Sequence, residues 1–346
     1  MTYIPDFSRQ LRLDSMSEAQ QKKLAETRVL VFGAGGLGVT ALSYLVGAGI
    51  GQITIVDPDR IDSSNLHRQT IYQISDIGNF KAEVAAHYLR QRSSLCKIEA
   101  ISQPFEFSKL HQLCEQQDII LDCTDDQLFS YQLNALCLLL KKIVVFANAV
   151  RLEGQLFVLH PDSDKPCFNC LWPRGQYYGD SCDQAGVLGP VPGMLGCLQA
   201  LEAIKLLTEH QNTLSGQLLH CDFSAYQFTT VNVPKSEHCM HSMTYQDIER
   251  DYGFKNTIPV CPSSEIDISA WICIDIRSEG EVSENPYPFA EQHIEMAKLA
   301  DKPEHYLVKD KNYLLVCATG KRSQLLSLQL QKKGYSVVPY KRAQTS

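Results

Sequence analysis

Hydrophobic positions between about residues 28 and 150 follow two alternating periods. Short apolar runs rich in β-branched residues, typical of buried strands, alternate with stretches whose apolar positions recur at helical spacing. The predicted strands cover residues 28–32, 52–57, 118–122 and 142–147, with helices between them. This alternation predicts an α/β domain with a doubly wound, mostly parallel sheet.

The pattern changes in the second half of the chain. A further short strand is predicted at 154–160, and a helix near 193–207 is apolar around most of its girth and therefore belongs to the core. Residues 234–262 are polar and contain three prolines, as a linker does. Strands at 271–276 and 313–317 and a helix at 323–333 then predict a small α/β module. We expect domains at 1–245 and 263–346, joined by a linker at 246–262.

Composition places the chain among ordinary soluble proteins. Its 346 residues are 44% hydrophobic and 21% charged, and the net charge of −7 argues against a general nucleic-acid binder. We expect no membrane segment, because no apolar run approaches about 18 residues and the N-terminus lacks a signal-like pattern. The thirteen cysteines are odd in number and scattered through core-like segments, so we expect free thiols and a cytoplasmic protein.

A glycine-rich turn follows the first strand and predicts a nucleotide site. Gly33, Gly35 and Gly38 form a G-x-G-x-x-G pattern with Gly36 inside it, and an apolar helix follows. Such a turn presents helix N-terminal N–H groups to a phosphate. Asp57, 19 residues after Gly38, ends the second strand where a ribose hydroxyl is held. This fingerprint alone is typical of an NAD-dependent dehydrogenase.

Charged residues downstream favour a triphosphate instead. Arg68 and Lys81 follow the second strand, where a dehydrogenase needs a dry nicotinamide slot. Cations near a phosphate loop stabilise charge when a bond to phosphorus breaks. Asp125 follows the strand at 118–122 and is placed to hold Mg²⁺.

An ordered set of motifs over residues 6–240 resembles the ThiF/MoeB/HesA family of ubiquitin-activating E1-like adenylyltransferases, which have a Rossmann-like sheet. The set comprises Ser8-Arg9-Gln10, Gly33–Gly38, Asp57-x-Asp59, Ser64-Asn65-Leu-x-Arg68-Gln69, Lys81, Asp122-Cys-Thr-Asp125, Glu153-Gly-Gln155, Cys167-x-x-Cys170, and Cys182 with Ala185-Gly-Val-Leu-Gly-Pro190. Each motif alone is weakly specific, whereas the ordered set is highly specific.

The resemblance implies that ATP binds at the glycine turn and that a carrier protein's C-terminal carboxylate attacks the α-phosphate. By carry-over, Asp57 and Asp59 bind the nucleotide, Asn65, Arg68 and Lys81 stabilise its phosphates, and Asp125 binds Mg²⁺. Arg9 reaches into the other subunit of a homodimer. The chain departs from the family at Asp126, where asparagine is common, and in having no arginine between 126 and 150.

Two further groups of cysteines predict chemistry. Cys167-x-x-Cys170 suits two ligands of a structural Zn²⁺. Members of the family supply a second Cys-x-x-Cys downstream, where this chain has Cys239 followed by Ser242, so His241 is the expected fourth ligand. His238 is an alternative fourth ligand. The other alternative is a decayed site that binds no metal. Cys182 faces the adenylate in similar proteins, either as a nucleophile or without a chemical task.

The segment Cys317-Ala-Thr-Gly-Lys-Arg-Ser323 closes a strand and opens a helix. Converging backbone N–H groups and a helix dipole there favour an anionic persulfide. The segment resembles the active-site loop of rhodanese sulfurtransferases, as does Ile274-Asp-Ile-Arg277. The alternative is a buried strand-end cysteine.

These observations predict a sulfur-relay enzyme. The first domain adenylates the C-terminal glycine of a ubiquitin-like sulfur carrier, and a Cys317 persulfide, supplied by a donor such as a cysteine desulfurase, displaces AMP to leave a thiocarboxylate. A ThiS-like carrier is favoured over a MoaD-like one because Cys170-Leu-Trp-Pro173 resembles the thiamine-pathway member. Alternatives are a peptide or tRNA-linked carboxylate as substrate, a dehydrogenase, and a non-catalytic scaffold that binds a ubiquitin-like protein.

Overall fold

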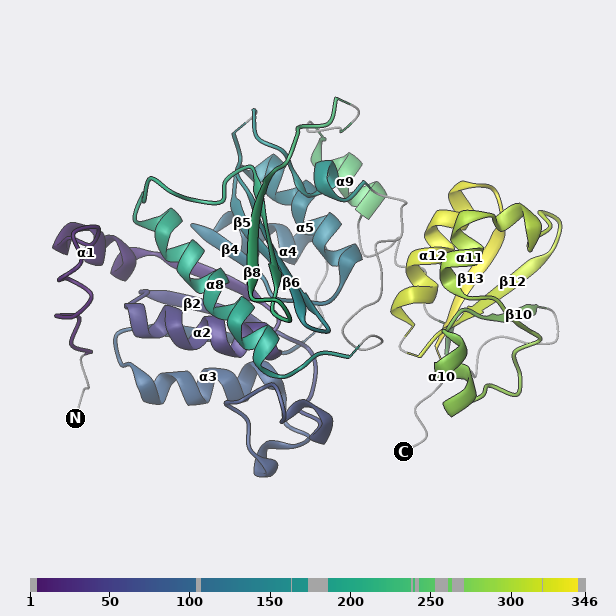
Figure 1. Cartoon of the computed structure of the whole chain (residues 1–346), viewed down its shortest axis with the longest axis horizontal. Coiled ribbons are helices and arrows are strands. Elements are labelled where there is room, and N and C mark those ends of the chain that lie inside the picture. Colours follow the sequence, from purple (N-terminus) through teal and green to yellow (C-terminus); the bar gives the residue numbers. More distant parts are fainter. Residues whose placement is uncertain are drawn as a thin grey trace. The chain divides into compact units, whose positions relative to one another are not determined.

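The computed structural model describes residues 5–103, 107–162, 164–173, 186–237, 239, 243–252, 261–262, 271–318 and 320–341. The chain forms two compact units, a larger one that extends to Ile248 and a smaller one from Glu249 onward (Figure 1). Each has its own sheet and its own hydrophobic core.

The larger unit is built on an eight-stranded sheet in the order β3-β2-β1-β4-β5-β6-β7-β8. The first five strands in this order are parallel and the remaining pairings are antiparallel. The doubly wound, mostly parallel sheet is therefore confirmed. The strands are β1 Arg28–Phe32, β2 Gln52–Val56, β3 Lys97–Ile101, β4 Ile119–Asp122, β5 Ile143–Val150, β6 Glu153–Leu159, β7 Gln217–Asp222 and β8 Gln227–Asn232.

Helices cover both faces of this sheet, as Figure 1 shows. Val29 and Val31 of β1 point into a core shared with α2, α3 and α8, while α4 and α5 lie on the opposite face. The helices are α1 Glu18–Glu26, α2 Gly36–Ala48, α3 Lys81–Arg92, α4 Phe107–Glu115, α5 Gln127–Leu140, α6 Phe168–Leu171, α8 Pro190–Leu207 and α9 Tyr245–Tyr252. None of the helices that the structure describes has the length and apolarity that crossing a bilayer demands.

The smaller unit has a parallel sheet in the order β11-β10-β12-β13-β9. Its strands are β9 Cys261–Pro262, β10 Ile272–Asp275, β11 Gln292–His293, β12 Asn312–Val316 and β13 Ser336–Lys341, and its helices are α10 Glu279–Glu284, α11 Met296–Asp301 and α12 Lys321–Lys332. One core lies between α11, α12 and this sheet. Within the range expected as linker, the described residues form α9 and β9, and β9 pairs with β13.

Candidate functional site

The strand order reverses between β1 and β4, and this is where the predicted nucleotide residues meet. β2 pairs with one edge of β1, and β4 pairs with the other edge. The glycine turn follows β1, Asp57 follows β2 and Asp125 follows β4, all at the carboxyl edge of parallel strands. Open α/β sheets bind ligands in the crevice at such a reversal.

The glycine turn is shaped by close backbone contacts. Gly33 has φ +91°, and a Cβ added there would lie 2.7 Å from the carbonyl oxygen of Cys123. A Cβ on Gly38 would overlap the carbonyl oxygen of Gly33. Gly35 is the N-cap of α2, and its Cβ position meets only the far end of Gln69, at 3.7 Å. The turn therefore leaves the helix N-terminus open to an anion.

Asp57 is buried beside the glycine turn and supports it through hydrogen bonds. Its Oδ2 accepts a hydrogen bond from the N–H of Ala34 at 2.7 Å, and its Oδ1 accepts one from the N–H of Asp59 at 2.9 Å. Burial raises the pKa of Asp57, and the charge of Lys81 partly offsets this. The carboxylate is thus committed to the glycine turn before any ribose reaches it.

Lys81 is a buried cation at the first residue of α3. Its Nζ lies 3.1 Å from Oδ2 of Asp59, and its side chain is only 10% exposed, against 68% for Asp59. A cation at a helix N-terminus opposes the helix dipole, so its charge favours an anionic partner.

Tyr72 is a site residue that sequence reasoning missed. Its buried hydroxyl lies 2.8 Å from the carbonyl oxygen of Ala34 and 3.2 Å from that of Lys81, so it can donate to either. It therefore joins the glycine turn to the start of α3. The available signal was a tyrosine inside a polar segment, which alone predicts nothing.

Asn65 and Arg68 lie in the segment between β2 and α3. Asn65 ends a short 3₁₀ helix, Ser63–Asn65, and its Oδ1 accepts from the N–H of Asp62 at 3.1 Å. Nη1 of Arg68 donates to the carbonyl oxygen of Ser64 at 3.0 Å, and the side chain is half-buried. Arg9 is exposed in the segment before α1, so its predicted reach into a partner stays a prediction.

The end of β4 carries three carboxylates with different surroundings. Asp122 is buried, Asp125 is exposed at the edge of the sheet, and Asp126 is the N-cap of α5 and accepts from the N–H of Phe129 at 3.1 Å. Aspartate caps a helix as well as asparagine does. The departure at Asp126 therefore leaves the start of α5 intact.

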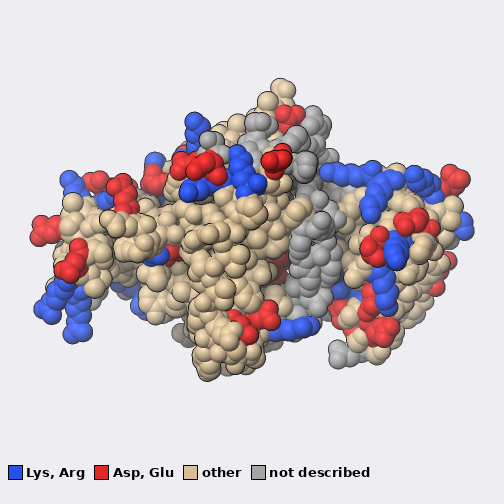
Figure 2. Space-filling model, turned by 45° about the horizontal axis from the view of Figure 1, so that its top comes forward, with Lys and Arg blue, Asp and Glu red and all other residues tan. Residues whose placement is uncertain are grey.

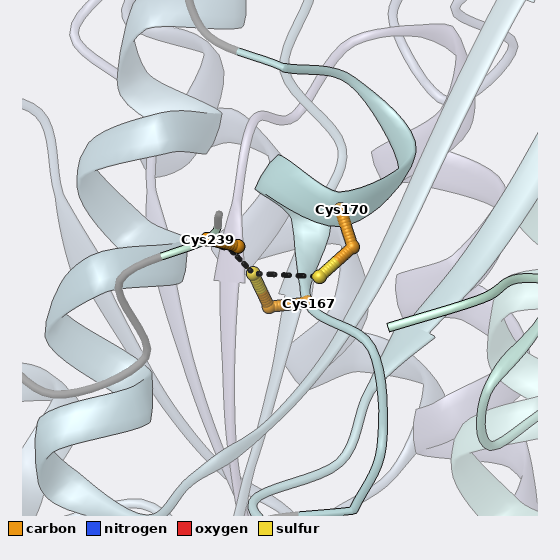
Figure 3. Close-up of side chains that lie close together, drawn as sticks. All are labelled: Cys167, Cys170 and Cys239. Carbon is orange, nitrogen blue, oxygen red and sulfur yellow. Dashed lines mark hydrogen bonds between the residues drawn. The ribbon is translucent and has the colours of Figure 1, made fainter. Parts of the chain in front are cut away.

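Three of the four expected zinc ligands converge, as Figure 3 shows. Sγ of Cys167 lies 3.8 Å from Sγ of Cys170 and 3.3 Å from Sγ of Cys239. A tetrahedral zinc with bonds of about 2.3 Å holds its sulfurs about 3.8 Å apart. The Cys167–Cys170 pair matches this distance and the Cys167–Cys239 pair is closer, so the thiols suit the ion after a small movement of Cys239. The contact with Cys167 and burial raise the pKa of the Cys239 thiol, which a bound cation would reverse. The predicted fourth ligand, His241, lies outside the described residues, as does Cys182.

Cys317 follows β12 in the smaller unit, and its buried sulfur accepts hydrogen bonds from two backbone N–H groups. Its Sγ accepts from the N–H of Gly320 at 3.1 Å and of Ser323 at 3.4 Å, at the start of α12. Arg322 beside it forms an ion pair with Glu281 of α10 at 2.6 Å. Two N–H groups are thus aimed at one sulfur, and Glu281 is a partner that sequence reasoning missed.

The ThiF family matches residues 7–241. The chain is 38% identical over 233 residues to a sulfur carrier protein ThiS adenylyltransferase of Escherichia coli (strain K12), which covers 67% of this chain and 92% of that relative. It is 35% identical over 240 residues to a SAMP-activating enzyme E1 of Haloferax volcanii, covering 69% and 88%. An adenylyltransferase and sulfurtransferase MOCS3 of Caenorhabditis briggsae is 36% identical over 233 residues, but the chain spans only 58% of it.

Solved structures share the fold of the larger unit. The chain resembles Escherichia coli MccB crystallised with ATP at a TM-score of 0.56 and 22% identity, over 64% of this chain and 67% of that one. At this identity the likeness supports the architecture alone.

Proposed function

Because this chain belongs to the ThiF family, we propose that its larger unit uses ATP to adenylate the C-terminal glycine of a ubiquitin-like sulfur-carrier protein. One observation carries this proposal. The glycine turn, Asp57 and Asp125 lie at the carboxyl edge of three neighbouring parallel strands, with Lys81 beside them. The relatives named as adenylyltransferases and an E1 supply the reaction class.

The residues of the nucleotide site have different roles in the adenylation step. The N–H groups of α2 receive phosphate oxygens, and Asp57 receives the ribose. Arg68, Asn65 and Lys81 offset the negative charge that grows as the carrier carboxylate attacks the α-phosphate and pyrophosphate leaves. Asp125 would hold Mg²⁺, which would supply positive charge beside the phosphates. Asp59 keeps the Lys81 ammonium in place until the nucleotide arrives.

We assign the second step to the smaller unit. The terminal sulfur of a persulfide on Cys317, supplied by a donor such as a cysteine desulfurase, attacks the acyl-adenylate, and AMP leaves to give an acyl disulfide. A second thiol then attacks the Cys317 sulfur and breaks this S–S bond, which releases the thiocarboxylate and leaves a disulfide between the second thiol and Cys317. The N–H groups of Gly320 and Ser323 would stabilise the anionic sulfur. Names of relatives that join an adenylyltransferase to a sulfurtransferase agree with this pairing of activities.

We propose that Cys167, Cys170 and Cys239 hold a structural Zn²⁺ with His241. The thiol spacing fits the ion, and the turn that carries two of the ligands has its own support, because Asn134 Oδ1 accepts from the N–H of Phe168 at 2.9 Å. The metal would tie this turn to the end of the larger unit and take no part in the reaction.

A homodimer is proposed from the apolar surface that α2 and α8 share. Tyr44 of α2 and Met194 and Leu201 of α8 are exposed although the two helices pack together. Figure 2 shows a broad uncharged area on the visible face of the larger unit, with Lys, Arg, Asp and Glu gathered at its margins. Exposed apolar side chains such as these three mark protein contacts. The thirteen cysteines are odd in number and scattered through the chain, which supports a reducing compartment, the cytoplasm.

The test is ATP–pyrophosphate exchange by the full chain with carriers that end in Gly-Gly. We expect exchange with a ThiS-like carrier, followed by a mass gain of about 16 Da, the replacement of oxygen by sulfur, when a persulfide donor is added. Exchange with a MoaD-like carrier alone would reassign the pathway. No exchange with any carrier, together with ATP-independent binding of one, would favour the scaffold alternative instead.

A further inference from the structure

A carboxylate that has no assigned role lies directly beneath the nucleotide turn. Asp122 is the last residue of β4 and is 2% exposed. Its Oδ1 accepts from the N–H of Thr124 at 3.0 Å and from the Thr124 hydroxyl at 2.7 Å, and its Oδ2 accepts from the Ser130 hydroxyl at 2.6 Å. Hydrogen bonds to a buried charge are among the stronger ones in proteins.

These bonds fix the backbone on which Asp125 stands. Thr124 immediately precedes Asp125, and both of its donors turn back to Asp122. Ser130 lies in the first turn of α5, so its bond attaches that helix to the end of β4. The position of the Asp125 backbone therefore depends on the Asp122 carboxylate.

The same short segment supports the glycine turn. A Cβ added to Gly33 would lie 2.7 Å from the carbonyl oxygen of Cys123. The N–H of Cys123 also donates a hydrogen bond to the carbonyl oxygen of Phe32 at 2.8 Å. A shift of the backbone at residue 123 would therefore move the turn that receives the phosphates.

Gln199 of α8 holds this segment from the other face of the sheet. Its fully buried Nε2 donates to the carbonyl oxygens of Asp122 at 2.9 Å and Val145 at 3.1 Å, and its Oε1 accepts from Sγ of Cys123 at 3.3 Å. The end of β4 is thus fastened to α5 on one side and to α8 on the other. A fully satisfied buried polar network of this kind specifies one arrangement.

We propose that Asp122 is a positioning residue for adenylation. Through Thr124 and Ser130, it fixes the position of Asp125 relative to the glycine turn. It lies beneath the turn and acts through the backbone of residues 123–125. This inference rests on the proposed function, because its readout is the adenylation reaction.

The experiment compares variants of the full chain in ATP–pyrophosphate exchange. Ser130→Ala removes one donor to Asp122, and we expect kcat/KM for ATP to fall about tenfold with KM for the carrier unchanged. Ser130→Thr keeps the hydroxyl and should restore most of the loss. Thr124→Val removes the other hydroxyl donor at similar volume and should reproduce the loss if Ser130→Ala fails to fold.

Ser43→Ala is the matched control, because the Ser43 hydroxyl donates to the carbonyl oxygen of Val39 within α2 at 2.8 Å and does not involve β4. Kinetic constants of Ser130→Ala and Thr124→Val equal to those of Ser43→Ala would overturn the positioning role and leave adenylation intact. A wild-type chain that shows no exchange with any carrier would overturn the proposed function, and the positioning role with it.

Discussion

Gly33 and Gly78 allow the cost of the close contact beneath the nucleotide turn to be measured. Both have left-handed backbones, with φ +91° and +88°. A Cβ on Gly33 would lie 2.7 Å from the carbonyl oxygen of Cys123, whereas a Cβ on Gly78 would meet nothing within 4 Å. The pair of alanine variants therefore shares the backbone strain and differs in the steric contact.

The magnitudes follow from these two terms. Left-handed backbone costs an alanine about 1–2 kcal/mol, so Gly78→Ala should lower stability by that amount. Gly33→Ala adds about 1–3 kcal/mol, because the oxygen it meets belongs to the backbone and cannot rotate away. We expect about 2–5 kcal/mol in total for Gly33→Ala.

Thermal unfolding of the full chain and ATP–pyrophosphate exchange provide the assay. Each kcal/mol corresponds to about 2–4 °C in the melting midpoint of a unit of this size. Gly33→Ala should lower the midpoint at least about twice as far as Gly78→Ala and should also raise KM for ATP, which Gly78→Ala should leave near the wild-type value. Equal midpoints and an unchanged KM for ATP would refute the reasoning that the contact with Cys123 shapes the turn.

Three further predictions concern the lysine, the thiol cluster and the smaller unit. Lys81→Ala should reduce pyrophosphate exchange about 100-fold or more and should also lower the melting midpoint, because Lys81 is buried and its charge faces Asp57 and Asp59; a full-rate variant would contradict the phosphate role. Zinc analysis of the purified chain should give about one ion, lost in Cys239→Ser and retained in Cys197→Ser, which alters a half-buried thiol of α8; equal zinc in both variants would exclude Cys239 as a ligand. Burial raises the pKa of Glu281, but Arg322 and the N–H and hydroxyl of Ser278 outweigh it and hold this pKa at about 2, below its ordinary 4.5. The stabilisation from these contacts is therefore present above pH 4.5 and is lost as the pH falls towards 2. Glu281→Gln should therefore cost about 1–2 kcal/mol at pH 7, after allowance for solvent screening, and should remove that acid dependence, as unfolding midpoints between pH 2 and 7 would test.

The mostly parallel sheet and the residues at the carboxyl ends of β1, β2 and β4 were predicted from the sequence, whereas the strand order was not. Buried parallel strands are recognisable in the sequence as continuous apolar runs. Right-handed crossovers place their carboxyl ends at the same edge of the sheet. β3, β7 and β8 were not predicted. β8 is exposed at all six positions, so it has no apolar face that would give a period.

The polar network beneath the site had no local signature. Gln199 lies 77 residues from Asp122, and neither residue type at its own position indicates a partner. Ser130 reads as an ordinary helix residue until its hydroxyl is seen 2.6 Å from Asp122. Such contacts depend on how α5 and α8 pack on the sheet, and packing is decided by the whole core rather than by neighbours in sequence. The convergence of Cys239 with Cys167 was expected only through the resemblance to a family.

Asp57 has a consequence for attempts to redesign nucleotide preference. Both of its oxygens already accept backbone N–H groups, from Ala34 of the glycine turn and from Asp59. An amide at this position would place an N–H against one of these donors, and a neutral side chain would leave an N–H unsatisfied. Exchanging this residue to favour another sugar or base would thus also reshape the turn that receives the phosphates. A change of specificity in this scaffold requires the carboxylate to stay and the new selectivity to be built from residues around it.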